Sequence, residues 1–268
     1  MRCRVIPNRG VDGGAVNPAA GAPQRTPVCR TDMISGQANP TAKILHRVPN
    51  LSGTKALPRY IAVEGPIGVG KTTLARRLAE ALRYPLMTEP VSENPFLDRF
   101  YIEGQQHALP TQLFFLLHRA RQVADMPGND LLGPHLVADF LIEKDRLFAQ
   151  LTLDEAEFKL YEQIHNSLQL TPPTPDLVIY LQAPAEVLDQ RIRRRGLAAE
   201  QHIKLEYLQA LADAYTEFFH YFEASPLLVV NAAEIDFAHN DRHFDTLLEQ
   251  IVRMEGSRQF FNPNPTLI

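Results

Sequence analysis

The sequence has little of what stabilises small secreted proteins or anchors proteins in membranes. Its 268 residues include no tryptophan and only two cysteines, Cys3 and Cys29. Both cysteines fall within the first thirty residues, so the later chain has no disulfide framework and no thiolate metal site. No run of 18 apolar residues could span a bilayer, and no apolar segment follows a basic start as in a secretory signal. We expect a cytoplasmic protein without a membrane segment.

Charge is distributed unevenly along the chain. Residues 1–57 hold eight Lys and Arg against two Asp, a net charge of +6, so the remainder carries −10 of the overall −4. This basic part contains six Pro and six Gly and has no sustained apolar period, so it cannot bury enough surface to offset the entropy of ordering it. We predict a disordered basic extension over residues 1–57, one folded domain over 58–256 and a tail over 257–268. The Pro and Gly residues argue against the alternative of a transit peptide.

Of all residues in the chain 45% are apolar, which gives the folded part enough apolar surface for one sizeable core. Its net negative charge argues against a general nucleic-acid-binding surface, which requires a basic face. Short β-prone runs alternate with helical apolar periods, which predicts an α/β domain with a parallel sheet covered on both faces. The expected strands are 60–64, 85–88, 135–140, 177–182 and 227–231, and the expected helices include 73–82, 109–124, 153–170, 185–195, 205–223 and 245–254.

A glycine-rich loop lies between the first expected strand and the first expected helix. Its letters, GPIGVGKT, match the Walker A spacing. The glycines let backbone N–H groups face an anion, Lys71 places a charge by the β- and γ-phosphates, and the Thr72 hydroxyl can ligate Mg²⁺. We therefore predict ATP binding by Gly65, Pro66, Ile67, Gly68, Val69, Gly70, Lys71, Thr72 and Thr73.

Two carboxylates follow neighbouring expected strands. Glu89 closes the second strand and Asp139 the third, so a parallel sheet would present both at the edge that carries the phosphate loop. Glu89 could orient and deprotonate an acceptor hydroxyl. Asp139 could hold Mg²⁺ together with Thr72. Either carboxylate, taken alone, could instead cap a helix or face solvent.

Two groups of polar residues lie at helical spacing. Gln112 and Arg119 are seven residues apart, hence on one helix face, where an amide can read a nucleobase and a guanidinium can brace a carboxylate such as Asp145. The ordinary alternative is the wet face of an amphipathic helix. Arg191 and Arg195, with Arg194 between them, suit a lid that neutralises a triphosphate, or else a solvated helix end.

The chain from residue 60 to about residue 254 resembles the deoxynucleoside kinases, specifically the bacterial deoxyadenosine/deoxyguanosine kinase branch. The resemblance implies a P-loop NTPase-type three-layer fold with a five-stranded parallel sheet, similar to thymidylate kinase. It also implies ATP and Mg²⁺ as cofactors and a homodimer. The blocks that carry it are IAVEGPIGVGKTTLA, TEPVSENPFLDRFY, PTQLFFLLHR, ADFLIEKDRLFA, RIRRRG and EQHIKLEYLQAL.

The resemblance implies a role for each matching position. Glu89 would be the general base for the nucleoside 5′-hydroxyl, with Lys71, Arg191 and Arg195 stabilising the transferring phosphoryl group. Residues 231–237 would form the loop that packs on the adenine of ATP. The substrate-binding set would be Glu89, Tyr101, Gln112, Arg119, Asp139, Asp145 and Glu200, in which Tyr101 and Glu200 hold the sugar 3′-hydroxyl and Gln112, Arg119 and Asp145 read the base.

The chain departs from the family pattern at two positions. Phe140 stands where many members have an arginine near the transferring phosphate. The role of that arginine is either absent here or supplied by another cation, for which Lys144 and Arg194 are candidates. Leu197 stands where some relatives have a further lid arginine.

The predicted reaction is ATP-dependent phosphorylation of the 5′-hydroxyl of a purine deoxynucleoside. Deoxyadenosine is favoured, with deoxyguanosine and deoxycytidine open. An ionised Asp145 accepts hydrogen bonds only, which suits an exocyclic amine and disfavours thymidine. Two alternatives stay open at this point: a nucleoside monophosphate kinase of the same fold, and a regulatory ATP-binding protein that catalyses nothing.

Overall fold

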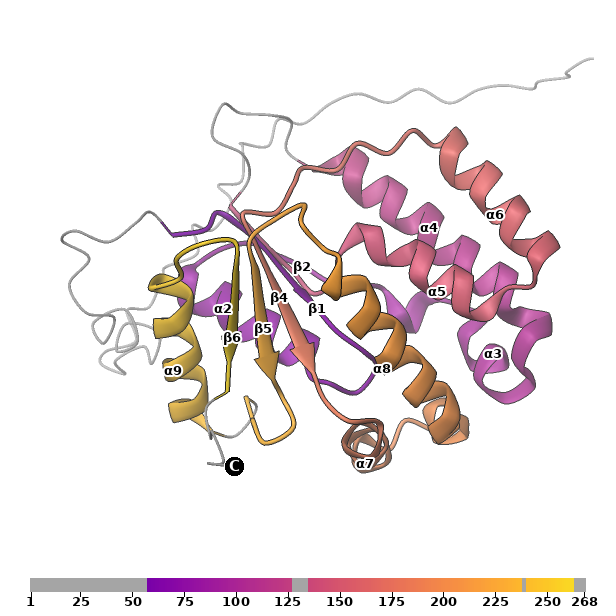
Figure 1. The fold of residues 1–268 in the computed structure, drawn as a ribbon. Coiled ribbons are helices and arrows are strands. Elements are labelled where there is room, and N and C mark those ends of the chain that lie inside the picture. The colour runs from indigo at the N-terminus through magenta and orange to yellow at the C-terminus, as the bar shows by residue number, and fades with distance from the viewer. Residues whose placement is uncertain (1–56, 127–134, 238–239, 263–268) are drawn as a thin grey trace, which may run out of the picture. The chain divides into compact units, whose positions relative to one another are not determined.

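A parallel sheet of six strands forms the centre of the computed structural model (Figure 1). The structure describes residues 57–126, 135–237 and 240–262. The predicted extension therefore lies, up to residue 56, outside the described residues, as do both cysteines. The strand order is β2-β3-β1-β4-β5-β6, and every pairing is parallel. The strands are β1 (Tyr60–Glu64), β2 (Leu86–Met87), β3 (Leu136–Ala138), β4 (Leu177–Gln182), β5 (Leu227–Asn231) and β6 (Arg258–Phe261).

The sheet has one strand more than the five predicted. β6 pairs with β5 in the register Val230 to Phe261, although its residues were assigned to the C-terminal tail. Two aromatic residues end this strand, of which Phe260 is exposed and only Phe261 is buried. An edge strand with one buried side chain has too short an apolar pattern to be distinguished from a tail.

Helices cover both faces of the sheet, which confirms the three-layer α/β fold (Figure 1). On one face Leu74 of α2 and Leu247 of α9 join the core of β1, β4 and β5. On the other face Tyr215 and Phe219 of α8 pack against Tyr180. The helices are α2 (Lys71–Leu82), α3 (Leu97–Glu103), α4 (Ala108–Asp125), α5 (Asp145–Thr152), α6 (Glu155–Ser167), α7 (Ala185–Arg195), α8 (Leu205–His220) and α9 (Asp241–Val252).

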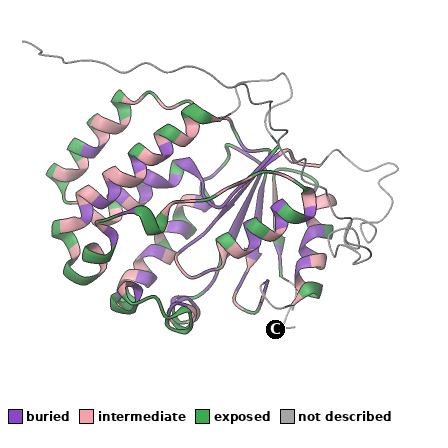
Figure 2. Cartoon of the chain, turned by 180° about the vertical axis from the view of Figure 1, so that it is seen from behind, coloured by how far each residue is buried: buried purple, intermediate pink, exposed green. Residues whose placement is uncertain are grey.

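Burial follows the expected pattern in the centre of the sheet, where β1, β3, β4 and β5 are almost entirely buried and the helices are buried on one side only (Figure 2). The edge strands β2 and β6 are more exposed. No helix among the described residues is long and apolar enough to cross a membrane. The expected helix over 153–170 is shorter, because Asp154 and Glu157 form a reciprocal capping box that starts α6 at Glu155. The residues before that cap form the separate helix α5, which the sequence reasoning did not identify.

Gly68 brings the phosphate loop close to α7. Its φ is 83°, and a Cβ there would lie 2.8 Å from Ile192 Cγ1 and 3.0 Å from the Leu188 carbonyl oxygen. Gly104 has a similar φ of 78°, but a Cβ there would meet nothing within 4 Å. It is therefore a matched control for the backbone strain alone.

We expect Gly104→Ala to lower the free energy of unfolding by about 1 kcal/mol through backbone strain. Gly68→Ala should cost about 1–3 kcal/mol beyond that, because α7 must also move away from the loop. Urea unfolding of both variants measures the difference. If both variants lose the same free energy of unfolding, α7 can shift without an energetic cost, and the short distance between Gly68 and α7 does not require glycine.

Candidate active site

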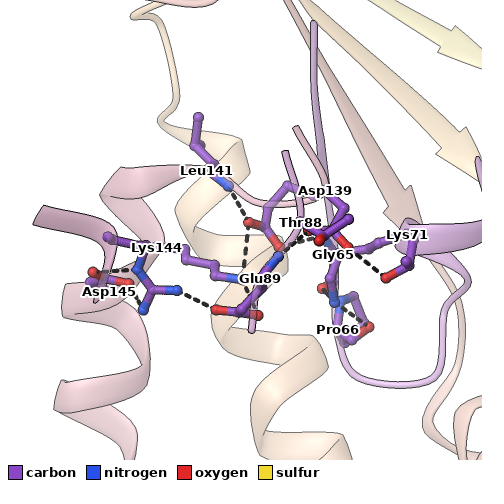
Figure 3. Close-up of polar contacts among 12 residues, drawn as sticks. Gly65, Pro66, Lys71, Thr88, Glu89, Asp139, Leu141, Lys144 and Asp145 are labelled. Carbon is purple, nitrogen blue, oxygen red and sulfur yellow. Dashed lines mark hydrogen bonds and ion pairs between the residues drawn. The ribbon is translucent and has the colours of Figure 1, made fainter. Parts of the chain in front are cut away.

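The phosphate loop joins β1 to the start of α2, so the helix N-terminus faces the loop. Lys71 Nζ donates to the carbonyl oxygens of Gly65, at 2.7 Å, and Pro66, at 3.2 Å, which holds the ammonium over the loop (Figure 3). Burial lowers the pKa of Lys71, and the neighbouring Lys144 lowers it further. Two ammonium groups close enough to repel each other form a site suited to an anion.

Asp139, which follows β3, connects the segment after β2 to the first turn of α2. Its Oδ2 accepts a hydrogen bond from Thr72 Oγ1 at 2.6 Å, and its Oδ1 accepts one from the Glu89 backbone N–H at 2.8 Å. The sheet therefore brings together the two strand-end carboxylates and the phosphate loop, as the spacing predicted. A hydroxyl oxygen and a carboxylate side by side are hard ligands of the kind that Mg²⁺ binds.

Glu89 lies between two cations. Its Oε1 pairs with Arg119 Nη1, and its Oε2 lies 3.2 Å from Lys144 Nζ. Burial alone would raise the pKa of Glu89, but Lys144, Arg119 and Lys71 together lower it to about 2. The carboxylate is therefore fully ionised at neutral pH and acts as a hydrogen-bond acceptor only.

Arg119 also pairs with Asp145, so it bridges two carboxylates. Arg119 Nε donates to Asp145 Oδ2 at 2.7 Å, and Nη2 makes an ion pair with Oδ1. Burial raises the pKa of Asp145 while Arg119 lowers it. Both side chains are almost fully buried. The prediction that Arg119 braces a carboxylate holds in this geometry.

Sequence reasoning missed Glu64, which is fully buried beneath the phosphate loop. Glu64 accepts hydrogen bonds from the Gly65 N–H at 2.8 Å, the Leu141 N–H at 2.6 Å and the Tyr215 hydroxyl at 2.9 Å. Lys144 Nζ lies 3.5 Å from its Oε2. Its place at the end of β1, matching Glu89 after β2 and Asp139 after β3, was a signal that could have identified it.

Lys144 places a cation beside Glu89. It is one of the two candidates to replace the arginine that many similar sequences have at the position of Phe140. Phe140 is fully buried, and Lys144, although a lysine, is only 3% exposed. Its ammonium contacts Glu89 (Figure 3) and also Glu64. Arg194, the other candidate, lines a different cavity and makes no hydrogen bond or ion pair with a described residue.

A cavity of about 130 Å³ opens beside Glu89. Tyr101 and Glu200 lie in its wall, and burial raises the pKa of the Tyr101 hydroxyl. Asp145 contacts the cavity only through Arg119. Sequence reasoning gave no role to several further lining residues: Val91, Leu97, Phe100, Thr111, Phe115, Phe148 and Tyr207.

A second cavity lies on the other side of the phosphate loop, between α7 and residues 233–237. The two cavities share Gly68, Lys71, Thr72 and Arg195 as lining residues. Arg195 Nε donates to Glu200 Oε2 at 2.9 Å, so it connects the walls of both. Both cavities thus border the phosphate loop, and Glu89 lines the first one only.

The guanidinium of Arg191 donates hydrogen bonds to backbone carbonyls. Its Nη1 donates to the Val69 carbonyl at 3.2 Å, and its Nη2 donates to the carbonyls of Ala232, at 2.7 Å, and Ala233 and Ile235, both at 3.2 Å. It therefore ties the phosphate loop to the loop after β5. Its predicted contact with the triphosphate would require some of these hydrogen bonds to be exchanged.

A phosphate loop adjoining a buried carboxylate and a small-molecule cavity defines a phosphotransferase of the P-loop class. The deoxynucleoside kinase family model matches residues 61–254. This match covers well over half of the chain, so the chain belongs to the deoxynucleoside kinase family. The resemblance inferred from the sequence motifs is confirmed.

Relatives and solved structures agree with this assignment. The chain is 34% identical to the deoxyguanosine kinase of Bacillus subtilis (strain 168) over 197 residues, covering 72% of this chain and 95% of the relative. It is 28% identical to the deoxyadenosine/deoxycytidine kinase of the same organism, covering 80% and 98%. The structure of M. mycoides deoxyadenosine kinase with bound dATP matches with a TM-score of 0.63 and 25% identity, covering 72% of this chain and 98% of that one.

Proposed function

We propose that this enzyme transfers the γ-phosphoryl group of ATP to the 5′-hydroxyl of a purine deoxynucleoside, with deoxyadenosine the preferred acceptor. The observation that carries the proposal is the position of Glu89. Glu89 lines the first cavity together with Lys71, and Lys71 also lines the second cavity, between α7 and residues 233–237. A hydroxyl bound to Glu89 would therefore face the phosphate held by the loop.

The geometry favours catalysis by positioning and charge neutralisation. Phosphoryl transfer through a loose transition state needs little early proton removal, so a carboxylate with a low pKa can orient the hydroxyl and accept its proton late. Lys71 and Lys144 flank Glu89 and would offset charge on the transferring group. Arg195, at the junction of the cavities, is placed to add to that charge.

Mg²⁺ fits the oxygen pair of Thr72 and Asp139. The Thr72 hydroxyl donates a hydrogen bond of 2.6 Å to Asp139, so the two oxygens lie side by side at the phosphate loop. Magnesium characteristically uses one or two protein oxygens and takes its other ligands from phosphates and water. Bound there, the ion would neutralise phosphate charge, while Asp139 also holds the backbone of Glu89 in place.

The cavity wall supports a nucleoside as acceptor. Tyr101 and Glu200 offer a hydroxyl and a carboxylate for a sugar hydroxyl, and Gln112 offers an amide for a base. Phe115 and Phe148 provide apolar faces for a planar ring. Of the cations that line this cavity, Arg119, Lys144 and Arg195 are paired with carboxylates, and Lys71 is held by two carbonyls of the phosphate loop. None is set aside for a phosphate already on the acceptor.

An ATP-coupled assay of the purified chain with the four deoxynucleosides, adenosine and deoxyadenosine monophosphate tests the proposal. We expect ADP release with deoxyadenosine to exceed that with thymidine and with the monophosphate by about 100-fold in kcat/KM, the scale on which unpaired buried polar groups penalise a poor substrate. Highest activity with the monophosphate would refute the acceptor assignment. ATP binding without nucleoside-dependent ADP release would refute the catalytic role.

The homodimer and the cytoplasmic location inferred from the family remain predictions. Leu117 on α4 and Leu160 on α6 are both large apolar side chains that are nearly half exposed. Exposed apolar side chains on these two helices are of the kind that a dimer interface would bury. Light scattering of the purified chain measures the oligomeric state directly.

A further inference from the structure

Helices α4 and α5 pack side by side and run antiparallel (Figure 1), and residues of both line the cavity beside Glu89. Arg119 of α4 meets Asp145 at the start of α5, and Gln112, two turns earlier on α4, meets Thr152 at the end of α5. Phe115 and Phe148 lie between these two pairs and both line the cavity. This wall of the cavity therefore consists of two polar pairs, Arg119–Asp145 and Gln112–Thr152, with the rings of Phe115 and Phe148 between them.

The pair of Gln112 and Thr152 has a defined hydrogen-bond direction. Thr152 Oγ1 donates its one hydrogen to the Phe148 carbonyl at 2.7 Å, the usual back-bond of a threonine in a helix. The hydroxyl can then only accept a further bond, so the amide nitrogen of Gln112 must face it, at a distance of 3.2 Å. Thr152 does not itself line the cavity.

This direction fixes what Gln112 presents to a ligand. Because Thr152 holds Nε2, the positions of the Oε1 acceptor and of the second N–H donor of Gln112 are fixed relative to each other and to α5. Oε1 makes no hydrogen bond with any described residue, and Gln112 lines the cavity. Without the anchor, the amide could rotate by half a turn and exchange its donor and acceptor.

Adenine and guanine need opposite arrangements of the hydrogen-bond donor and acceptor on Gln112. Adenine offers an amine donor beside a ring acceptor, whereas guanine offers a carbonyl acceptor beside a ring N–H donor at the same places. A freely rotating amide can match either base. A fixed amide matches one and presents like groups to the other.

We propose that Thr152 is a specificity-determining residue of this enzyme: by holding the Gln112 amide in one orientation, it lets the site discriminate amino from oxo purines. The inference rests on the proposed nucleoside kinase activity. Thr152 is a positioning residue, since it acts on the base only through Gln112.

The test compares kcat/KM for deoxyadenosine and deoxyguanosine in the wild-type chain and three variants. Thr152→Val keeps the shape and removes the acceptor, while Thr152→Ser retains a hydroxyl that can form the same back-bond. Thr246→Val is the matched control, because Thr246 on α9 makes a back-bond to the Arg242 carbonyl and lines neither cavity. All are measured in the full chain with saturating ATP.

We expect Thr152→Val to move the ratio of the two kcat/KM values toward one by about tenfold, the scale of a bidentate base contact. The wild-type ratio should persist in Thr152→Ser and Thr246→Val. A ratio in Thr152→Val within twofold of wild type overturns the inference. A wild-type chain that phosphorylates neither nucleoside would instead refute the proposed function, so the two failures are distinct.

Discussion

Replacing Glu89 by Gln is expected to lower kcat by about 10²-fold or more while leaving the fold and ATP binding intact. The amide keeps the size of the side chain but cannot accept a proton from the 5′-hydroxyl. It also loses the charge that pairs with Arg119 and Lys144. Steady-state kinetics with deoxyadenosine measure kcat, and fluorescent ATP-analogue binding measures the intact phosphate site.

Glu93→Gln is the matched control for this variant. Glu93 follows Glu89 by four residues in the same connection, but its side chain is largely exposed and lines neither cavity. Its substitution should leave kcat unchanged within about twofold. Near-normal turnover in Glu89→Gln would reject the assignment of Glu89 as the base.

Replacing Lys144 by Met should have the largest combined effect on stability and activity. The change leaves Glu64 and Glu89 without a shared cation in a buried setting. Losing one partner of such a cluster costs about 3–5 kcal/mol of unfolding free energy. Losing a cation near the transferring group should lower kcat by about 10²-fold. Urea unfolding and steady-state kinetics measure the two effects separately.

The pH profile distinguishes a local electrostatic role from general damage. In the wild type the pKa of Glu89 is about 2, so this group stays ionised above about pH 4 and produces no acid limb there. Without Lys144 its pKa rises, so the acid limb of kcat/KM should move to higher pH.

Lys144→Arg restores a cation and should recover most of the activity, while Lys159→Met, at an exposed ion pair on α6, should have no effect. An unshifted acid limb in Lys144→Met would contradict this role.

The elements that could be predicted from the sequence are those with local signals. The phosphate loop is one continuous motif, and the carboxyl ends of parallel strands meet at one edge, which placed Glu89 and Asp139 beside Lys71 in advance. Helical spacing likewise placed Gln112 and Arg119 on one face. These predictions needed only short-range periodicity and the geometry of a parallel sheet.

The rest depended on contacts that periodicity does not encode. The short helical turn Ile142–Lys144 directs Lys144 back to Glu89, which no spacing rule indicates. Glu64 receives a hydrogen bond from Tyr215, 151 residues away. Arg191 has the spacing of a lid cation, but its backbone partners come from a loop after β5. Such roles emerge only when segments distant in sequence pack together.

The bridging position of Arg119 has a consequence for fidelity. One guanidinium holds both Asp145, beside the proposed base-binding wall, and Glu89, the proposed acceptor of the hydroxyl proton. A nucleobase that draws Arg119 toward itself must weaken its hold on Glu89, which makes that carboxylate a better proton acceptor. In the proposed reaction, recognition of the base would thereby tune reactivity at the 5′-hydroxyl, so a mismatched base would lower kcat as well as binding affinity.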